Sequence, residues 1–340
     1  MAAEIDDSLP ITVLVISILS LLINATLFIL YIRCPLKKMN SYRYFFLLII
    51  IEDTLYSIGI ALDTPRIISK HYLLIFVATG IVRQKPFSHI LHVAYCMTFF
   101  IAMVTITNSF VYRYMLLCRT ALFHKFSTTK TMLFGFLMNL LVVGNIFLAL
   151  YISFWPDEAF SAFVAHYIGI PRINVKEAAL FGFSLKYEMD TFHRSLVVEL
   201  ILLLIIVCFI NVYCAMKIKD FLKNAKQSNS FLSLQRQIFV LLLLQAACPV
   251  VFLLAPYCFA MCMLFTGVNS TTLITNIISI SFALFPVFNP IVVIVFVKEY
   301  RSFVLALLKL KKTPEQTVKL FYQSKTRALD THPTSSTRPA

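Results

Sequence analysis

Charged residues are scarce in this sequence: Asp, Glu, Lys and Arg supply 14% of the 340 residues, whereas hydrophobic types supply 59%. A water-soluble domain of this length needs a polar, charged exterior, so the composition excludes an ordinary soluble fold. The apolar residues also occur in runs of about 20, the length at which a helix crosses a hydrocarbon core about 30 Å thick. We therefore expect an all-α membrane protein whose first partner is the lipid bilayer.

Glycine and metal-binding patterns are also sparse, which bears on two other classes of membrane protein. Gly59, Gly135 and Gly144 are the glycines inside the predicted spans, and no pair of spans is broken in the way that is typical of inverted-repeat transporters. No H-E-x-x-H motif occurs, and His92 is the one histidine well inside a predicted span, so a metal-dependent hydrolase lacks its ligands. We expect no enzyme activity and no cofactor, and a ligand-gated channel or transporter remains the alternative to a receptor.

Seven apolar runs are long enough to span, at residues 10–32, 43–63, 89–113, 131–154, 195–217, 237–265 and 272–297. A further run at 73–82 has only 10 residues and is rich in β-branched types, so it is too short for a spanning helix. We expect it to form an extended loop packed over the mouth of the bundle. An eighth span here would move every later loop to the other side of the membrane.

The basic residues predict the direction of the chain. The connections at 33–43, 113–130 and 217–236 and the tail from 298 hold 22 of the 30 Lys and Arg residues, and the opposite side holds eight. Because cytoplasmic loops carry an excess of Lys and Arg, this split predicts an outside N-terminus and an inside C-terminus. It also accounts for the net charge of +14 without a nucleic-acid partner.

The ends of the chain fall outside the bundle in this interpretation. Residues 1–9 form an extracellular N-terminus, and 10–297 form the seven-span domain. Residues 298–312 place Phe303, Leu307 and Leu310 on one face between basic residues, which is typical of a short helix in the membrane interface. Residues 313–340 are rich in Ser, Thr and Pro and are expected to be a disordered cytoplasmic tail.

Ionisable groups inside spans are functional candidates because burying them in hydrocarbon is costly. Asp53 in the second span has polar neighbours at comparable depth in Asn24 and Asn289, so we expect a cluster of the three. Two interpretations remain open for this cluster: a switch whose hydrogen bonds differ between two helix arrangements, or static polar packing. Glu199 lies about one turn below the outer surface, where it can meet a ligand or pair at the interface with Arg194 or His193.

The inner end of the third span and the middle of the sixth carry two further signals. Arg113, preceded by Tyr112, fits either a signalling role or an arginine that extends to lipid headgroups. Pro249 and Pro256 each remove a backbone hydrogen bond and bend the sixth span. The bend is either a hinge for a moving inner half or a fixed kink that aids packing.

Several segments together resemble the nematode seven-transmembrane chemoreceptors of the Str group, from about residue 10 to 302. The segments are NSFVYRY at 108–114 with Cys118 and Arg119, the sixth-span set Gln245, Pro249 and Pro256, PVFNPIVVIVFVKEYR at 286–301, and DTLYSI at 53–58 after KKMNSYRYFF. Two features depart from the expected pattern. Asn289-Pro290 stands where the group often has Asp-Pro, and Tyr112 stands where rhodopsin-like receptors place an acid beside the arginine, which leaves open how the resting state is held.

The resemblance implies an olfactory-type receptor in the plasma membrane of chemosensory cells, on a sensory cilium, coupled to a heterotrimeric G protein. Its ligand is then a small odorant or a water-soluble cue that enters from outside between the third, fifth, sixth and seventh spans. Candidate lining residues, chosen by depth, are Tyr95, Phe99, Met103, Glu199 and Tyr257. Arg113, Tyr112, Asp53, Asn24, Asn289, Pro249 and Pro256 are the candidates for the switch and for G-protein coupling.

Overall fold

The computed structural model describes residues 8–34, 43–82, 84, 86–126, 129–154, 160, 162–164, 180–185, 191–225 and 229–307. Seven helices in this part are long and apolar enough to cross a membrane. They are α1 (Ser8–Arg33), α2 (Arg43–Asp63), α3 (Phe87–Cys118), α5 (Thr129–Phe154), α7 (Thr191–Asn224), a segmented sixth span of α8 (Asn229–Pro249), η2 (Val250–Leu254) and α9 (Ala255–Thr266), and α10 (Thr272–Phe296). The prediction of a seven-span bundle is confirmed.

Three strands add a sheet to the fold that we expected to be all-α. β1 (Pro65–Lys70), β2 (Leu73–Ala78) and β3 (Leu180–Ser184) form an antiparallel sheet in the order β1-β2-β3. β1 and β2 are joined by a tight turn in which His71 and Tyr72 have φ of 50° and 65°, the left-handed pair that matches the twist of a hairpin. The run at 73–82 is thus extended over residues 73–78, as a strand where a loop was predicted, and all six β2 residues are buried.

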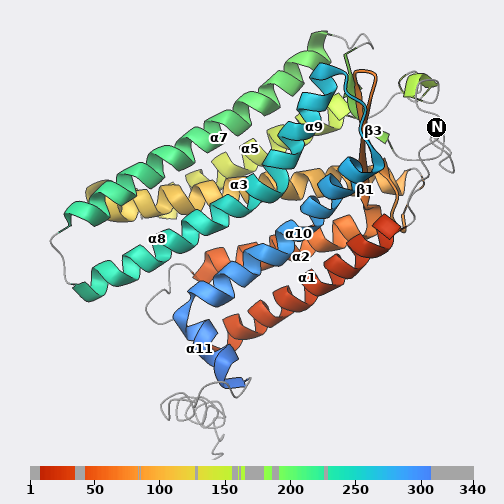
Figure 1. Ribbon diagram of the computed structural model, residues 1–340. Coiled ribbons are helices and arrows are strands. Elements are labelled where there is room, and N and C mark those ends of the chain that lie inside the picture. Colours follow the sequence, from red (N-terminus) through yellow and green to blue (C-terminus); the bar gives the residue numbers. More distant parts are fainter. Residues whose placement is uncertain are drawn as a thin grey trace, which may run out of the picture.

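The sheet and the last helix mark opposite ends of the bundle (Figure 1). The sheet lies beside the start of α1 and packs against α9 and α10, and we call this the sheet end. The short helix α11 (Lys298–Leu307) follows α10 at the other end, which we call the α11 end. Another short helix, α4 (Thr120–Phe126), follows α3. Each end of the bundle has its own cluster of buried apolar residues.

Polar groups are concentrated between the helices, whereas the lipid-facing surface is apolar. On α1 the buried positions Val13, Ser17, Ser20, Asn24 and Leu27 recur every three or four residues, so they form one stripe along the helix. Small and polar residues are common at helix contacts in membranes, because they allow close approach and hydrogen bonding. The other faces of α1 carry Leu, Ile and Phe side chains that are exposed at the surface.

The ends of the chain are described only in part. The region predicted as an interfacial helix at 298–312 is helical over Lys298–Leu307. Tyr300 is fully buried and its ring lies 6.4 Å from that of Phe46, which attaches α11 to α2. Residues 1–7 of the predicted extracellular N-terminus and the predicted disordered tail at 313–340 lie outside the described residues.

Candidate functional site

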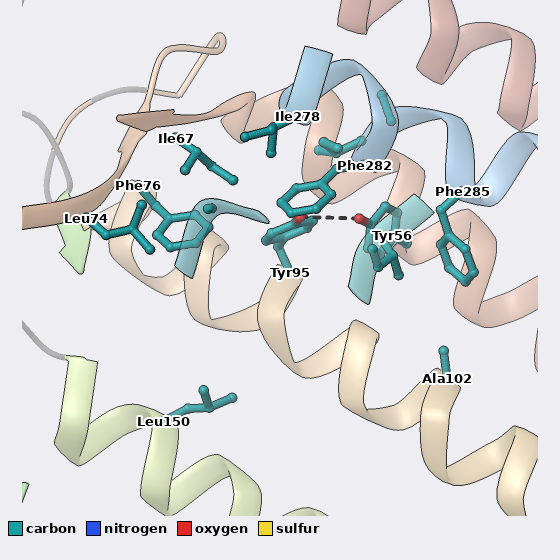
Figure 2. Packing of buried hydrophobic residues seen from close by; sticks show 14 of the residues in the cluster. Tyr56, Ile67, Leu74, Phe76, Tyr95, Ala102, Leu150, Ile278, Phe282 and Phe285 are labelled. Atoms are coloured by element: carbon teal, nitrogen blue, oxygen red, sulfur yellow. Dashed lines mark hydrogen bonds between the residues drawn. The ribbon is translucent and has the colours of Figure 1, made fainter. Parts of the chain in front are cut away.

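A cavity of about 120 Å³ lies at the sheet end, between α3, α7, the η2 turn and the sheet. Its wall is almost entirely apolar and aromatic: Tyr56, Phe76, Tyr95, Cys96, Phe99, Phe100, Leu150, Val197, Leu200, Ile201, Leu204, Leu253, Leu254, Tyr257 and Phe282. Figure 2 shows part of this cluster, with Tyr95 and Phe282 between the strand residue Phe76 and the helical residue Tyr56. A concave apolar wall with few polar groups is typical of a site for a small molecule.

Three tyrosines, Tyr56, Tyr95 and Tyr257, belong to this wall, and the first two are hydrogen-bonded to each other. The Tyr56 hydroxyl donates a hydrogen bond of 3.2 Å to the Tyr95 hydroxyl, and their ring centroids are 5.1 Å apart (Figure 2). Tyr56 also meets Phe285 of α10 edge to face at 5.3 Å. One hydrogen bond between two hydroxyls uses one of their two protons, so the other proton is left for a ligand oxygen. No lining residue is acidic or basic, so the cavity suits an uncharged molecule.

The cavity is in direct contact with the irregular middle of the sixth span. Leu253 and Leu254 in its wall belong to the π-helical turn η2, which Pro249 precedes and Pro256 follows. The proline rings remove backbone N–H donors, and the Ala255 N–H bonds to the Val250 carbonyl, five residues back. Single π turns are frequent at functional positions because the helix is locally widened there. The two prolines at which bends were predicted thus lie on either side of one distorted segment.

At the α11 end, Arg113 of α3 lies buried against α8. Its Nη1 donates a hydrogen bond of 2.6 Å to Oε1 of Gln235. Arg113 is 6% exposed and Gln235 is 8% exposed, so the contact is inside the protein and Arg113 does not extend to lipid headgroups. The neighbouring Tyr112 packs its ring against Phe45 and Phe123, each 5.7 Å away between centroids. Sequence reasoning missed Gln235, because nothing in the pattern of α8 distinguishes it from other polar residues there.

The central polar cluster forms two separate contacts between helices. Asn289 Nδ2 donates a hydrogen bond of 2.9 Å to Oδ2 of Asp53, which joins α10 to α2. Asn24 Nδ2 donates instead to the Pro286 carbonyl at 3.1 Å, and Ser20 Oγ donates to the same carbonyl at 2.8 Å. In a regular helix that carbonyl would accept from residue 290, which is a proline without an N–H. Asn24 and Ser20 therefore satisfy a carbonyl that the helix leaves open.

Three carboxyl groups within the spans, Asp53, Glu52 and Glu199, share one kind of environment. Each accepts a hydrogen bond from a neutral side chain on another helix. Beyond the Asp53 contact, Thr105 Oγ1 donates to Glu52 at 2.5 Å and Asn145 Nδ2 donates to Glu199 at 2.6 Å. Neutral donors make the burial of these groups tolerable at the places where lipid offers none.

The structure distributes the predicted ligand residues between the cavity and its surroundings. Tyr95, Phe99 and Tyr257 line it. Met103 is buried about one turn further along α3, outside the wall, and Glu199 is joined to Asn145 of α5. The largest group of lining residues that sequence reasoning missed comes from α7, and others come from η2 and α3. A continuous apolar pattern gives no sign of which side chains of α7 and η2 point inward.

Comparison with known families completes this description. The model of the serpentine seven-transmembrane G-protein-coupled chemoreceptor family Str matches residues 10–305, most of the chain. No curated protein matches the sequence. The matched region covers all seven spans, the sheet, the cavity and the Arg113 contact. The chain therefore belongs to the Str family of serpentine chemoreceptors, and it is a multi-pass membrane protein of the chemosensory receptor class.

Proposed function

We propose that this chemoreceptor binds a small, uncharged, mainly apolar molecule in the cavity at the sheet end and activates a heterotrimeric G protein at the α11 end. The observation that carries the proposal is the course of the sixth span. Its η2 turn lines the cavity through Leu253 and Leu254, and the same helical segment carries Gln235, which holds Arg113. Leu254 and Gln235 are roughly 28 Å apart along the helix at 1.5 Å per residue.

The direction of the chain follows from its charges in this proposal. With the sheet end outside, the basic connections and α11 face the cytoplasm, where positively charged loops are retained. The G protein then meets the end of the bundle at which Arg113 is buried. The site of action is the plasma membrane, on a sensory cilium, as expected for the detection of an external chemical.

The energies involved are comparable in size. Burying about 150 Å² of apolar ligand surface is worth about 4 kcal/mol. A hydrogen bond to a charged group such as Arg113 is worth about 1.5–3 kcal/mol. The receptor is taken to exchange between a resting arrangement, in which Arg113 contacts Gln235, and an active one without that contact. A ligand shifts this equilibrium only by the difference between its affinities for the two arrangements. A cavity that changes shape when η2 straightens or bends supplies such a difference, and releasing the Gln235 contact takes about half of the binding energy.

The experiment uses cells that express the full chain with a surface tag and a reporter of G-protein dissociation. A panel of small neutral compounds and charged analogues is applied, and we expect responses to members of the neutral set. Cys96→Phe fills the cavity and should abolish the response at normal surface expression. Cys258→Phe is the matched control, because Cys258 is exposed on α9 and lies outside the cavity wall. Equal loss in both variants, or equal response in both, would contradict the proposed site.

A further inference from the structure

The sheet closes the cavity at the end that faces outward in the proposed orientation. Phe76 of β2 is part of the cavity wall and is 6% exposed. Figure 2 shows Phe76 and Ile67 on the strand side of Tyr95 and Phe282. The β2 strand is hydrogen-bonded on both edges, to β1 and to β3, so an opening along it requires a ladder to part.

The sheet is also attached to several helices around the cavity. The Thr79 and Gly80 N–H groups donate to the Asp63 carbonyl at the end of α2, at 3.0 and 2.8 Å. The Asp63 carboxylate lies 2.6 Å from Nδ1 of His92 on α3, and both side chains are buried. Ser279 of α10 donates to the Pro65 carbonyl at 3.0 Å.

The loop between α9 and α10 holds the tip of the hairpin. The Ser270 N–H donates to the Ser69 carbonyl at 2.7 Å, and its hydroxyl accepts from the Ser69 N–H at 3.0 Å. The Asn269 side chain accepts from the His71 N–H at 3.0 Å. A route through the sheet end would break these contacts together, and the buried Ser69 would lose its partners.

The wall on the α7 side has the opposite character. Along the sheet end α7 packs chiefly against α3 and α5, and its contacts with the sixth span lie mainly in the cluster at the α11 end. Ile201 of α7 lines the cavity and is nevertheless 42% exposed at the outer surface of the bundle. Across from it, Leu254 is half-buried and its neighbour Val251 is exposed. This part of the wall therefore separates the cavity from lipid by little more than side chains.

From these observations we propose that ligands enter the cavity from the bilayer, between α7 and the η2 turn, and that the receptor's ligands are uncharged, membrane-soluble molecules. The inference rests on the proposed ligand site. The surface around the passage is apolar on both sides, with Leu202, Ile205 and Val251 exposed, so a dissolved hydrocarbon-like molecule meets no polar barrier. Moving a charged molecule through the hydrocarbon to the same place costs several kcal/mol of free energy, because the charge loses its hydration. The membrane thus both concentrates and selects the ligands.

The experiment measures entry directly, on the full chain in phosphatidylcholine nanodiscs. The probe is a neutral phenyl trifluoromethyl diazirine, which is photoreactive, and its counterpart is the same aryl diazirine with a carboxylate. After mixing, samples are illuminated at successive times, and labelling of the α3 residues Tyr95 and Phe99 is followed by mass spectrometry. We expect the neutral probe to label these residues and the charged one not to label them. Equal labelling by the charged probe would overturn the proposal.

Variants then locate the route. Ile201→Trp and Leu254→Trp place a bulky ring in the passage, and we expect labelling about tenfold slower because the overpacked gate must open further. Leu202→Trp is the matched control, since Leu202 faces lipid beside the passage and does not line the cavity. Ser270→Ala weakens the attachment of the hairpin and should leave the rate unchanged. Faster labelling in Ser270→Ala, or an unchanged rate in both tryptophan variants, would show that ligands pass through the sheet end instead.

The outcomes separate this inference from the proposal on which it depends. A tryptophan that blocks the passage slows labelling but leaves the final level after long incubation unaltered, whereas one that fills the cavity lowers the final level. Labelling of Tyr95 and Phe99 at a rate insensitive to both tryptophans would refute lateral entry and leave the ligand site intact. If the neutral probe labels neither residue at long times, the cavity does not accept such molecules and the proposed site itself fails.

Discussion

Arg113 on α3 and Gln235 on α8 are joined by a hydrogen bond of 2.6 Å although they lie 122 positions apart in the chain. The acceptor is a neutral amide oxygen on another helix, whereas the residue beside Arg113 is Tyr112. A charged donor with a neutral acceptor forms an intermediate contact, stronger than one between neutral groups and weaker than an ion pair. We infer that it is the restraint on the resting state that the sequence left open.

Removal of the Gln235 side chain is therefore expected to raise signalling in the absence of ligand. Gln235→Ala loses a hydrogen bond worth about 1.5–3 kcal/mol, which corresponds to roughly ten- to hundredfold in the equilibrium between arrangements. Gln235→Glu creates an ion pair and should lower the basal signal below that of the natural protein. Ligand-independent G-protein dissociation measures both, normalised to surface expression. If Gln235→Ala leaves ligand-independent signalling at the level of the natural protein, the contact does not restrain activation.

A second prediction concerns Asn24 and the carbonyl that Pro290 leaves without a donor. Asn24→Ala should destabilise the protein by about 1–3 kcal/mol, because a buried acceptor loses one of its two donors. In a Pro290→Ala background the helix has its own N–H for the Pro286 carbonyl, so the same change should cost less. Thermal unfolding of the detergent-solubilised receptor gives the two differences. Equal destabilisation by Asn24→Ala in both backgrounds would show that Asn24 does not act through the Pro286 carbonyl.

Gly80 tests the attachment of the sheet to α2. A Cβ atom at this position would overlap the Leu62 carbonyl and the Asp63 backbone, so the main chain itself would have to shift. Gly80→Ala should therefore cost about 1–3 kcal/mol in stability. Gly135→Ala is the control, because no described atom lies within 4 Å of its added Cβ and alanine favours the helix by up to about 1 kcal/mol. Thermal unfolding that ranks the two variants the other way would contradict this placement of the hairpin.

The hydroxyl of Tyr95 is expected to select among ligands. Tyr95→Phe keeps the ring and removes a hydroxyl of the cavity wall that can hydrogen-bond to a ligand oxygen. For compounds with a carbonyl or hydroxyl group we expect a loss of about 0.5–1.5 kcal/mol, roughly two- to tenfold in half-maximal concentration. Pure hydrocarbons should be affected little. Concentration–response curves for matched pairs, such as an alkane and its ketone, measure the difference, and a uniform shift would assign Tyr95 to packing alone.

Much of the candidate site depends on the directions in which side chains point, and a single sequence indicates those directions only weakly. Tyr95, Phe99 and Tyr257 were chosen by depth alone and line the cavity. Depth follows from counting residues along a spanning helix. Counting residues did not show which side of α7 or of η2 faces the cavity. Leu, Ile and Val occupy nearly every side of those segments, so their periodicity does not indicate which residues point inward. Gln235 and Pro286 carry no local signal of the partners that they meet.

The sequence by itself determined that the chain crosses a membrane seven times and where it does so, because hydrocarbon thickness fixes the length of each apolar run and lipid permits only internally bonded helices. It also located the distorted sixth span, since proline removes a backbone donor wherever it occurs. Only the tertiary structure decided that Arg113 meets Gln235, that Asn24 serves the Pro286 carbonyl, and that strands more than a hundred residues apart close one end of the bundle. Those contacts depend on how each helix is rotated and packed against its neighbours. That rotation is set by close packing among side chains that a uniformly apolar sequence barely distinguishes.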